Sequence, residues 1–236
     1  MVIPIRGLAS QNSWAFATIG LISLNFVIFF FQLHIGQEAA LKLFWQGGAI
    51  PAKLSQVKLF GSGQSLKLAA TMFTSLFLHA GWVHLLGNML FLWVFGEALE
   101  GELGHWRFLG FYLFCGFFSL LIHSLAASKL SAPIIGASGA IAGVLGAHLI
   151  RFPQAPVQTL VYLLVKVKII AIPAYVWLGF WLLLQFYGLR QGGPVAWFAH
   201  LGGFFTGLLG VFLFLPDASS GRGQKTARRP KNRRRR

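Results

Sequence analysis

Four polar side chains in apolar runs of this chain are of the types that could do chemistry together. Ser138 lies in the segment 136–139 (Gly-Ala-Ser-Gly), His200 in an apolar run near the C-terminus, and His84 and Asn88 in a third run. A serine hydroxyl becomes a nucleophile when a base removes its proton, and histidine is the usual base near neutral pH. We therefore expect Ser138 and His200 to be a catalytic pair. The oxyanion of an acyl transfer would need fixed donors, which His84, Asn88 and a backbone N–H could provide.

The chain offers no acidic residue that could orient His200. Its only aspartate, Asp217, follows the last apolar run, and Glu97 and Glu100 fall in the last turn of an expected helix. The sequence therefore predicts a Ser-His dyad rather than a triad. The same scarcity of carboxylates argues against an aspartic protease and against ion-coupled transport, and no His-Glu-x-x-His motif indicates a zinc protease.

The composition is that of a multi-spanning membrane protein. Of the 236 residues, 56% are hydrophobic and 11% are charged, and the mean hydropathy is +0.68. Nine of the 20 Lys and Arg residues, which give most of the net charge of +15, follow Asp217. A basic run beside a last membrane span is typical of an orientation signal that contacts anionic lipid headgroups, so we expect no nucleic-acid partner.

Six apolar segments predict an all-α membrane protein, a bundle of six transmembrane helices. We place the helices at 14–33, 82–100, 106–127, 138–151, 169–189 and 195–215. The domain organisation is then a cytoplasmic N-terminus at 1–13, the membrane domain at 14–215 and a basic tail at 216–236. The loop 34–70 is expected to lie half inserted in the interface, and 152–168 to be a surface connection.

The fourth helix is expected to be short and to start inside the membrane. From Ser138 to Ile150 there are 13 apolar residues before Arg151, whereas a span of the bilayer core needs about 20. The free N–H groups of such a buried helix start would face Ser138, and protein or water must cover them.

The four polar side chains are expected to share one layer of the membrane. Counting back from helix ends at Glu100, Arg151 and Leu215 at about 1.5 Å per residue gives similar depths for all of them. Those depths are about 18 Å for Asn88, 20 Å for Ser138, 22 Å for His200 and 24 Å for His84. Glycine rows on the fourth and sixth helices, which let membrane helices approach closely, would bring Ser138 to His200. These rows are Gly139, Gly143 and Gly146, and Gly202, Gly203, Gly207 and Gly210.

The distribution of Lys and Arg predicts cytoplasmic termini in a plasma membrane. With both termini inside, 14 Lys and Arg residues lie on the cytoplasmic side and 6 on the other. Without the basic tail the count is 5 against 6, so the tail decides the orientation.

Three motifs, taken in order, resemble those of the rhomboid intramembrane serine proteases. They are 77–88 (Phe-Leu-His-Ala-Gly-Trp-Val-His-Leu-Leu-Gly-Asn), 136–139 (Gly-Ala-Ser-Gly) and 199–203 (Ala-His-Leu-Gly-Gly), and the resemblance covers most of 71–210. It implies a nucleophile at Ser138, a general base at His200 and oxyanion donors at His84 and Asn88. It also implies cleavage in or next to the transmembrane helix of a substrate, without metal or cofactor.

The chain departs from many family members at two places. It has Ala70-Thr71 where they carry Trp-Arg, and Ala142 where some have a tyrosine that packs on the histidine. Neither departure removes a reacting group.

On this basis we expect an endopeptidase for single-pass membrane proteins. The substrate would enter sideways and unwind locally, which Gly or Pro near the cleaved bond would favour. The alternative is a rhomboid-like protein that binds transmembrane helices without cutting them. A channel or transporter is a further alternative. The other histidines, His34, His79, His105, His123 and His148, are expected to have structural or interface roles.

Overall fold

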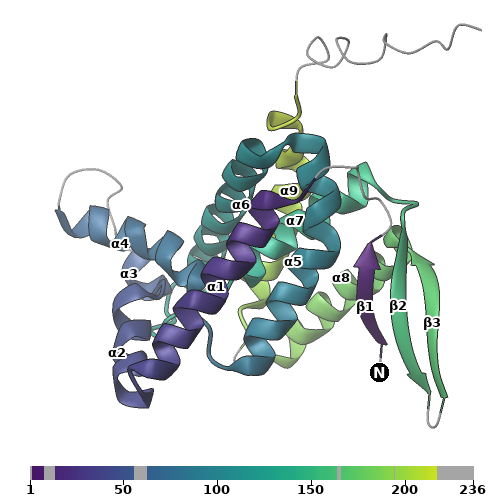
Figure 1. Ribbon diagram of the computed structural model, residues 1–236. Coiled ribbons are helices and arrows are strands. Elements are labelled where there is room, and N and C mark those ends of the chain that lie inside the picture. Colours follow the sequence, from purple (N-terminus) through teal and green to yellow (C-terminus); the bar gives the residue numbers. More distant parts are fainter. Residues whose placement is uncertain (1, 8–13, 56–62, 164–165, 194, 217–236) are drawn as a thin grey trace, which may run out of the picture.

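The computed structural model describes residues 2–7, 14–55, 63–163, 166–193 and 195–216. Its larger helices are α1 (Phe16–His34), α5 (Trp82–Leu103), α6 (His105–Ala126), α7 (Ser138–Arg151), α8 (Ala174–Gln191) and α9 (Trp197–Gly210) (Figure 1). Between α1 and α5 lie α2 (Gln37–Gly47), α3 (Pro51–Leu54), α4 (Gly63–Thr74) and the short η1 (Ser75–Phe77), and η2 (Val211–Leu213) follows α9. The expected basic tail lies outside the described residues, apart from Pro216.

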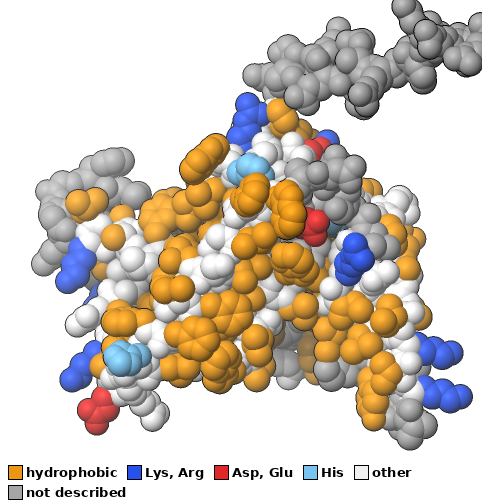
Figure 2. All heavy atoms as spheres, viewed as in Figure 1, with side chains coloured by type: hydrophobic (Ala, Val, Ile, Leu, Met, Phe, Trp, Pro, Cys, Tyr) orange, Lys and Arg blue, Asp and Glu red, His pale blue; other side chains and the backbone are white. Residues whose placement is uncertain are grey.

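Three of the described helices, α1, α5 and α6, are long and apolar enough to cross a membrane. Helix α1 buries one stripe, Thr18, Leu21, Asn25, Phe29 and Gln32, whose spacing follows the helical repeat. Its other faces present apolar side chains outward, and Figure 2 shows hydrophobic side chains over most of this side of the molecule, with most of the charged ones towards its margins. Such an apolar surface is suited to contact with the acyl chains of lipids. The count of six spans remains a proposal.

The fold is mostly helical, as expected, but it is not all-α, because three strands form an antiparallel sheet beside the helices. Strand β1 (Val2–Gly7) pairs with β2 (Pro156–Leu163), and β2 pairs with β3 (Lys166–Pro173), in the order β1-β2-β3. The sheet stands beside α5 and α8 in Figure 1. A Cβ on Gly7 would collide with the carbonyl oxygen of Val94, so β1 rests directly on the backbone of α5.

The predicted fifth helix began too early, because its first five residues belong to β3. The segment 166–172 is rich in Val and Ile, which favour strands, and its apolar run continues without a break into α8. Hydropathy alone therefore cannot distinguish the end of β3 from the start of α8. Pro173 separates them: it has no N–H to donate and is the N-cap of α8, with extended backbone at φ −57° and ψ 141°.

The hairpin of β2 and β3 changes where two lysines lie. Strand β2 leaves the end of α7 and has eight residues, a length of roughly 26 Å at about 3.3 Å per residue. The paired ends of the two strands, Leu163 and Lys166, lie at the same end of the molecule as α2 (Figure 1). Lys166 begins β3 at this end, and Lys168 lies two residues further along the strand, so neither lies beside Arg151, with which the sequence grouped them.

Helix α7 is the centre of the bundle. It contacts α5, α6, α8 and α9, and every residue from Gly139 to His148 is buried. Against α9 the contact is backbone to backbone, since a Cβ on Gly203 or Gly207 would collide with the carbonyl oxygen of Gly139 or Gly143. The expected close approach of these two helices is thus confirmed.

Two of the predicted glycines face another helix. A Cβ on Gly202 would lie 2.9 Å from Ile122, and one on Gly210 would lie 2.8 Å from Phe114. Both neighbours belong to α6, so the glycines of α9 serve contacts with α6 as well as with α7. The sequence could not separate the two faces, because each face of a buried helix is apolar.

Candidate active site

The backbone that leads into α7 holds Ser138 at the start of the helix. Ile134 and Ala49 form an antiparallel bridge, with N–O distances of 2.7 and 3.0 Å, and the Gly136 N–H donates to the carbonyl of Ser75 at 2.8 Å. Gly136 has φ +115°, which favours glycine. Helix α7 begins at Ser138, and its N-cap, Ala137, has no side-chain oxygen to bond the first N–H groups.

Ser138 and His200, which are 62 positions apart, form a hydrogen bond. The Oγ atom of Ser138 lies 2.9 Å from Nε2 of His200, and both side chains are half-buried. The pairing follows from the glycine contacts of α7 and α9, because Gly139 adjoins Ser138 and Gly203 lies one turn after His200. The expected juxtaposition of the two residues is therefore present.

Gln185 on α8 is a partner of His200 that the sequence analysis missed. Its Oε1 lies 2.8 Å from Nδ1 of His200, and its side chain is 5% exposed. The sequence has no acidic residue suited to this role, but an amide oxygen accepts the same hydrogen bond as a carboxylate. A glutamine within the apolar run of the fifth helix was the signal that could have found it.

His84 and Asn88 lie on one face of α5 close to Gly136. A Cβ built on Gly136 would be 2.6 Å from Nε2 of His84 and 3.6 Å from Nδ2 of Asn88. The N–H of Ala80 donates to Nδ1 of His84 across 3.4 Å, so Nδ1 accepts and the ring proton is on Nε2, the atom nearest Gly136. Asn88 Nδ2 lies 2.9 Å from Nε2 of His79 and has a second N–H available.

His79 supports this arrangement from outside the cavity. It is 1% exposed, and its backbone is held by Gln32 of α1, which accepts from the His79 N–H at 3.2 Å and donates to its carbonyl at 2.8 Å. Its ring stacks edge-on against His84 with centroids 5.0 Å apart. These contacts agree with the structural role expected for His79.

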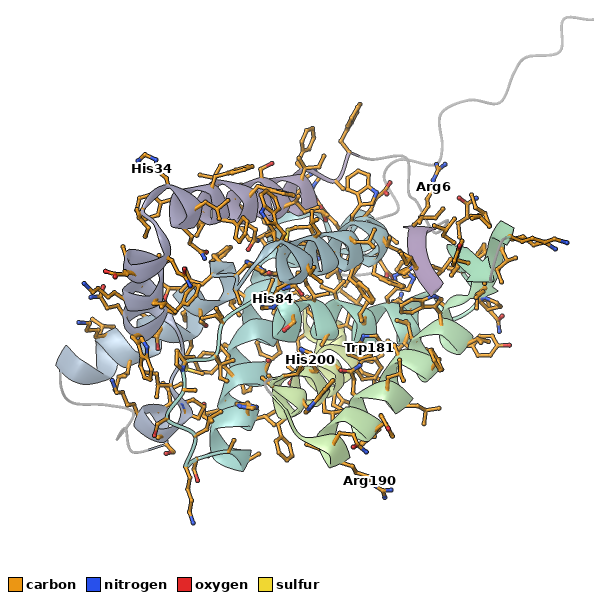
Figure 3. The ribbon with its side chains drawn as sticks, turned by 90° about the horizontal axis from the view of Figure 1, so that it is seen from below. Arg6, His34, His84, Trp181, Arg190 and His200 are labelled. Atoms are coloured by element: carbon orange, nitrogen blue, oxygen red, sulfur yellow. The ribbon has the colours of Figure 1, made fainter. Side chains whose placement is uncertain are left out.

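A cavity of about 730 Å³ joins these side chains. Figure 3 shows His84 and His200 near one another in the middle of the bundle, with Trp181 of α8 beside them, while Arg6, His34 and Arg190 lie at the edges. The four predicted residues line the cavity together with apolar side chains such as Phe91 and Leu145. Ala142 also lines it, so the small residue at this position leaves part of the space open.

The fold and this site define an integral membrane protein with a hydrogen-bonded serine and histidine in a cavity within a helical bundle. A sequence model of the Rhomboid domain matches residues 68–217, which include all four predicted site residues. The chain belongs to the rhomboid family.

Curated relatives agree with this family. The chain is 37% identical over 147 residues to RHOMBOID-like protein 1 of Arabidopsis thaliana, covering 61% of this chain and 34% of that protein. It is 33% identical over 142 residues to Rhomboid protein 1, mitochondrial, of Saccharomyces cerevisiae, covering 57% of this chain and 39% of that protein. It is 32% identical over 103 residues to the Presenilin-associated rhomboid-like protein, mitochondrial, of Bos taurus, covering 42% of this chain and 27% of that protein. The matched regions thus span between about a quarter and two fifths of these relatives.

Proposed function

We propose that this protein is an intramembrane serine endopeptidase that cleaves transmembrane segments of single-pass membrane proteins. The observation that carries the proposal is the hydrogen bond of 2.9 Å between Ser138 Oγ and His200 Nε2 in a cavity inside the bundle. The membership of the rhomboid family supports it. Neither cofactor nor metal is required by the reaction, because serine and histidine together supply the nucleophile and the base.

The first half-reaction would transfer the acyl part of the substrate to Ser138. As Oγ attacks the carbonyl carbon of the cleaved bond, His200 Nε2 takes the hydroxyl proton. The carbonyl oxygen becomes an oxyanion, and the candidate donors are Nε2–H of His84, the free N–H of Asn88 and the backbone N–H of Ser138. The imidazolium of His200 then gives its proton to the leaving amine, and an ester with Ser138 remains.

Hydrolysis of this ester would reverse the roles. Water replaces the amine and attacks the ester carbonyl while His200 Nε2 removes a proton from the water. As the tetrahedral intermediate collapses, the imidazolium returns this proton to Ser138 Oγ, and the acid product is released as a carboxylate. The substrate must present an extended carbonyl, because a helical carbonyl is already hydrogen-bonded and shielded by its own helix. Substrates with Gly or Pro near the cleaved bond should therefore be favoured.

The setting of this activity is part of the same proposal. We place the protein in a plasma membrane with both termini in the cytoplasm, six spans and α7 starting at membrane depth, and we assign contacts with anionic lipids to the basic tail. These assignments rest on the pattern of charge and hydropathy in the sequence.

Labelling with a fluorescent fluorophosphonate, together with cleavage of a reconstituted transmembrane peptide, tests the reaction. The unaltered protein should label and cleave, and Ser138→Ala and His200→Ala should lose at least about 10⁴-fold in rate. The matched control is Ser124→Ala, which removes another buried serine, on α6, and should retain both activities. Cleavage that persists in Ser138→Ala would refute the proposal, whereas helix binding without any product would favour the non-enzymatic alternative.

A further inference from the structure

The buried amide of Gln185 has a defined direction. Its Nε2 lies 3.0 Å from the carbonyl oxygen of Trp181, one turn earlier on α8. A carbonyl oxygen can only accept a hydrogen bond, so the NH₂ group of Gln185 must face Trp181. The amide oxygen therefore faces the other way, towards Nδ1 of His200, at 2.8 Å.

This direction fixes which nitrogen of His200 carries the proton. Because Oε1 of Gln185 only accepts, Nδ1 of His200 must be the donor, and in the neutral ring Nε2 is then left with a lone pair. That lone pair faces Ser138 Oγ at 2.9 Å. In the opposite tautomer, two acceptors would meet at Nδ1 and the hydroxyl of Ser138 would lose its acceptor.

We propose that Gln185 is a positioning residue that holds His200 in the tautomer required to act as the base for Ser138. The tautomer is inferred from the hydrogen bonds alone. Its consequence for catalysis rests on the proposed function. A glutamine does for this histidine what a carboxylate does in a Ser-His-Asp triad, but without a charge. A neutral partner suits a site within apolar helices, where a buried carboxylate in the free enzyme would be costly.

Two tryptophans hold the ring that Gln185 orients. The imidazole of His200 lies 6.3 Å from the ring of Trp181 and 5.9 Å, edge-on, from the ring of Trp197. Trp197 in turn packs on α8 at Gly188, where a Cβ would collide with the indole. Helix α8 thus supplies the hydrogen-bond acceptor and one of the two aromatic neighbours, and it contacts the other.

Nuclear magnetic resonance of ¹⁵N-histidine in the unaltered protein tests the tautomer directly. The signals of His200 are assigned by their loss in His200→Ala. We expect a protonated Nδ1 and an unprotonated Nε2 at a pH where the ring is neutral. A protonated Nε2 would overturn the inference, whether or not the protein cleaves a substrate.

Kinetics of two Gln185 variants test the consequence for the reaction. Gln185→Met keeps the length of the side chain and removes the amide oxygen, so kcat should fall by about 10-fold, the upper range for one neutral hydrogen bond, with KM unchanged. Gln185→Glu keeps an acceptor oxygen and should recover most of kcat. Asn25→Leu is the matched control: it removes a buried amide that bonds only within α1, to the Leu21 carbonyl, and should leave kcat unchanged.

The outcomes separate this inference from the proposed function. If the unaltered protein neither labels nor cleaves, the proposed function fails, and the tautomer measurement still decides the role of Gln185. If the unaltered protein cleaves but Gln185→Met keeps its kcat and its His200 tautomer, Gln185 is not a positioning residue. The inference also fails if Asn25→Leu lowers kcat as much as Gln185→Met does.

Discussion

Gly203 of α9 packs against the carbonyl oxygen of Gly139 of α7 so closely that no Cβ fits between them. Gly139 directly follows Ser138, and Gly203 lies one turn after His200, so this contact sets the separation of the two side chains. The distance of 2.9 Å between Ser138 Oγ and His200 Nε2 is a consequence of backbone contact between two helices.

Gly203→Ala should therefore force α7 and α9 apart. We expect a loss of about 1–3 kcal/mol in the free energy of unfolding from overpacking. The rate of cleavage should fall by about 100-fold, because a displacement of roughly 1 Å in a catalytic pair has an effect of that size. Unfolding in detergent measures the change in unfolding free energy, and cleavage of a reconstituted peptide measures the change in rate. Gly179→Ala on α8, where nothing lies within 4 Å of the added Cβ, is the control and should change neither.

Gly136→Ala should damage the site while leaving the fold in place. The new Cβ would lie 2.6 Å from Nε2 of His84, and the backbone at φ +115° would be strained as well. Displacement of an oxyanion donor should lower the cleavage rate by about 100-fold or more. Gly193 also has a positive φ, +98°, but nothing lies within 4 Å of a Cβ built on it. Gly193→Ala should therefore strain the backbone without lowering the cleavage rate. Equal losses in both variants would contradict a specific role for the space beside His84.

Glu100→Gln should destabilise the protein without altering the reaction. Glu100 is 1% exposed, and its carboxylate accepts from the N–H groups of Ala17 and Thr18 at the start of α1, both at 2.7 Å, and contacts Nδ1 of His105 at 2.5 Å. An amide would turn a donor towards one of these donors, at a cost of about 1–3 kcal/mol in unfolding free energy. The exposed Glu38→Gln is the control, with an expected change within about 0.5 kcal/mol. If the kcat of folded Glu100→Gln is lower than that of the unaltered protein, the prediction is contradicted.

Replacing the nine Lys and Arg residues after Asp217 by Gln should invert or mix the orientation of the protein. The sequence assigns 5 Lys and Arg residues outside the tail to the cytoplasmic side and 6 to the other, and the separation of Lys166 and Lys168 from Arg151 weakens the cytoplasmic share further. The predicted orientation then depends on the tail alone. Accessibility of single cysteines placed in the tail and in α2, with Cys115 replaced by Ala, measures the two populations. If the variant with the nine Gln substitutions keeps a single, unchanged orientation, the tail does not determine the topology.

Hydropathy, together with breaks in the helical pattern, located the described helices well where polar or glycine residues separate the apolar segments. Helix α5 begins at Trp82 after Ala80-Gly81, and α6 begins beside the expected Trp106. The same reasoning missed the sheet, because a strand rich in Val and Ile that runs into an apolar helix gives one continuous signal. Strand β1 was missed for a different reason: six residues become a strand only when β2 lies beside them.

The sequence by itself determined which residues could react, since the hydroxyl, imidazole and amide groups are properties of Ser138, His200, His84 and Asn88. It also determined that these residues belong to apolar helices, because the helical repeat and hydropathy are local properties of the chain. The tertiary structure decided which of them meet. The hydrogen bonds between His200 and Gln185 and between His79 and Gln32 join different elements, and a neutral amide in an apolar run carries no charge that would indicate its partner in advance. Only the packing of α7, α8 and α9 brings these atoms to within hydrogen-bond distance.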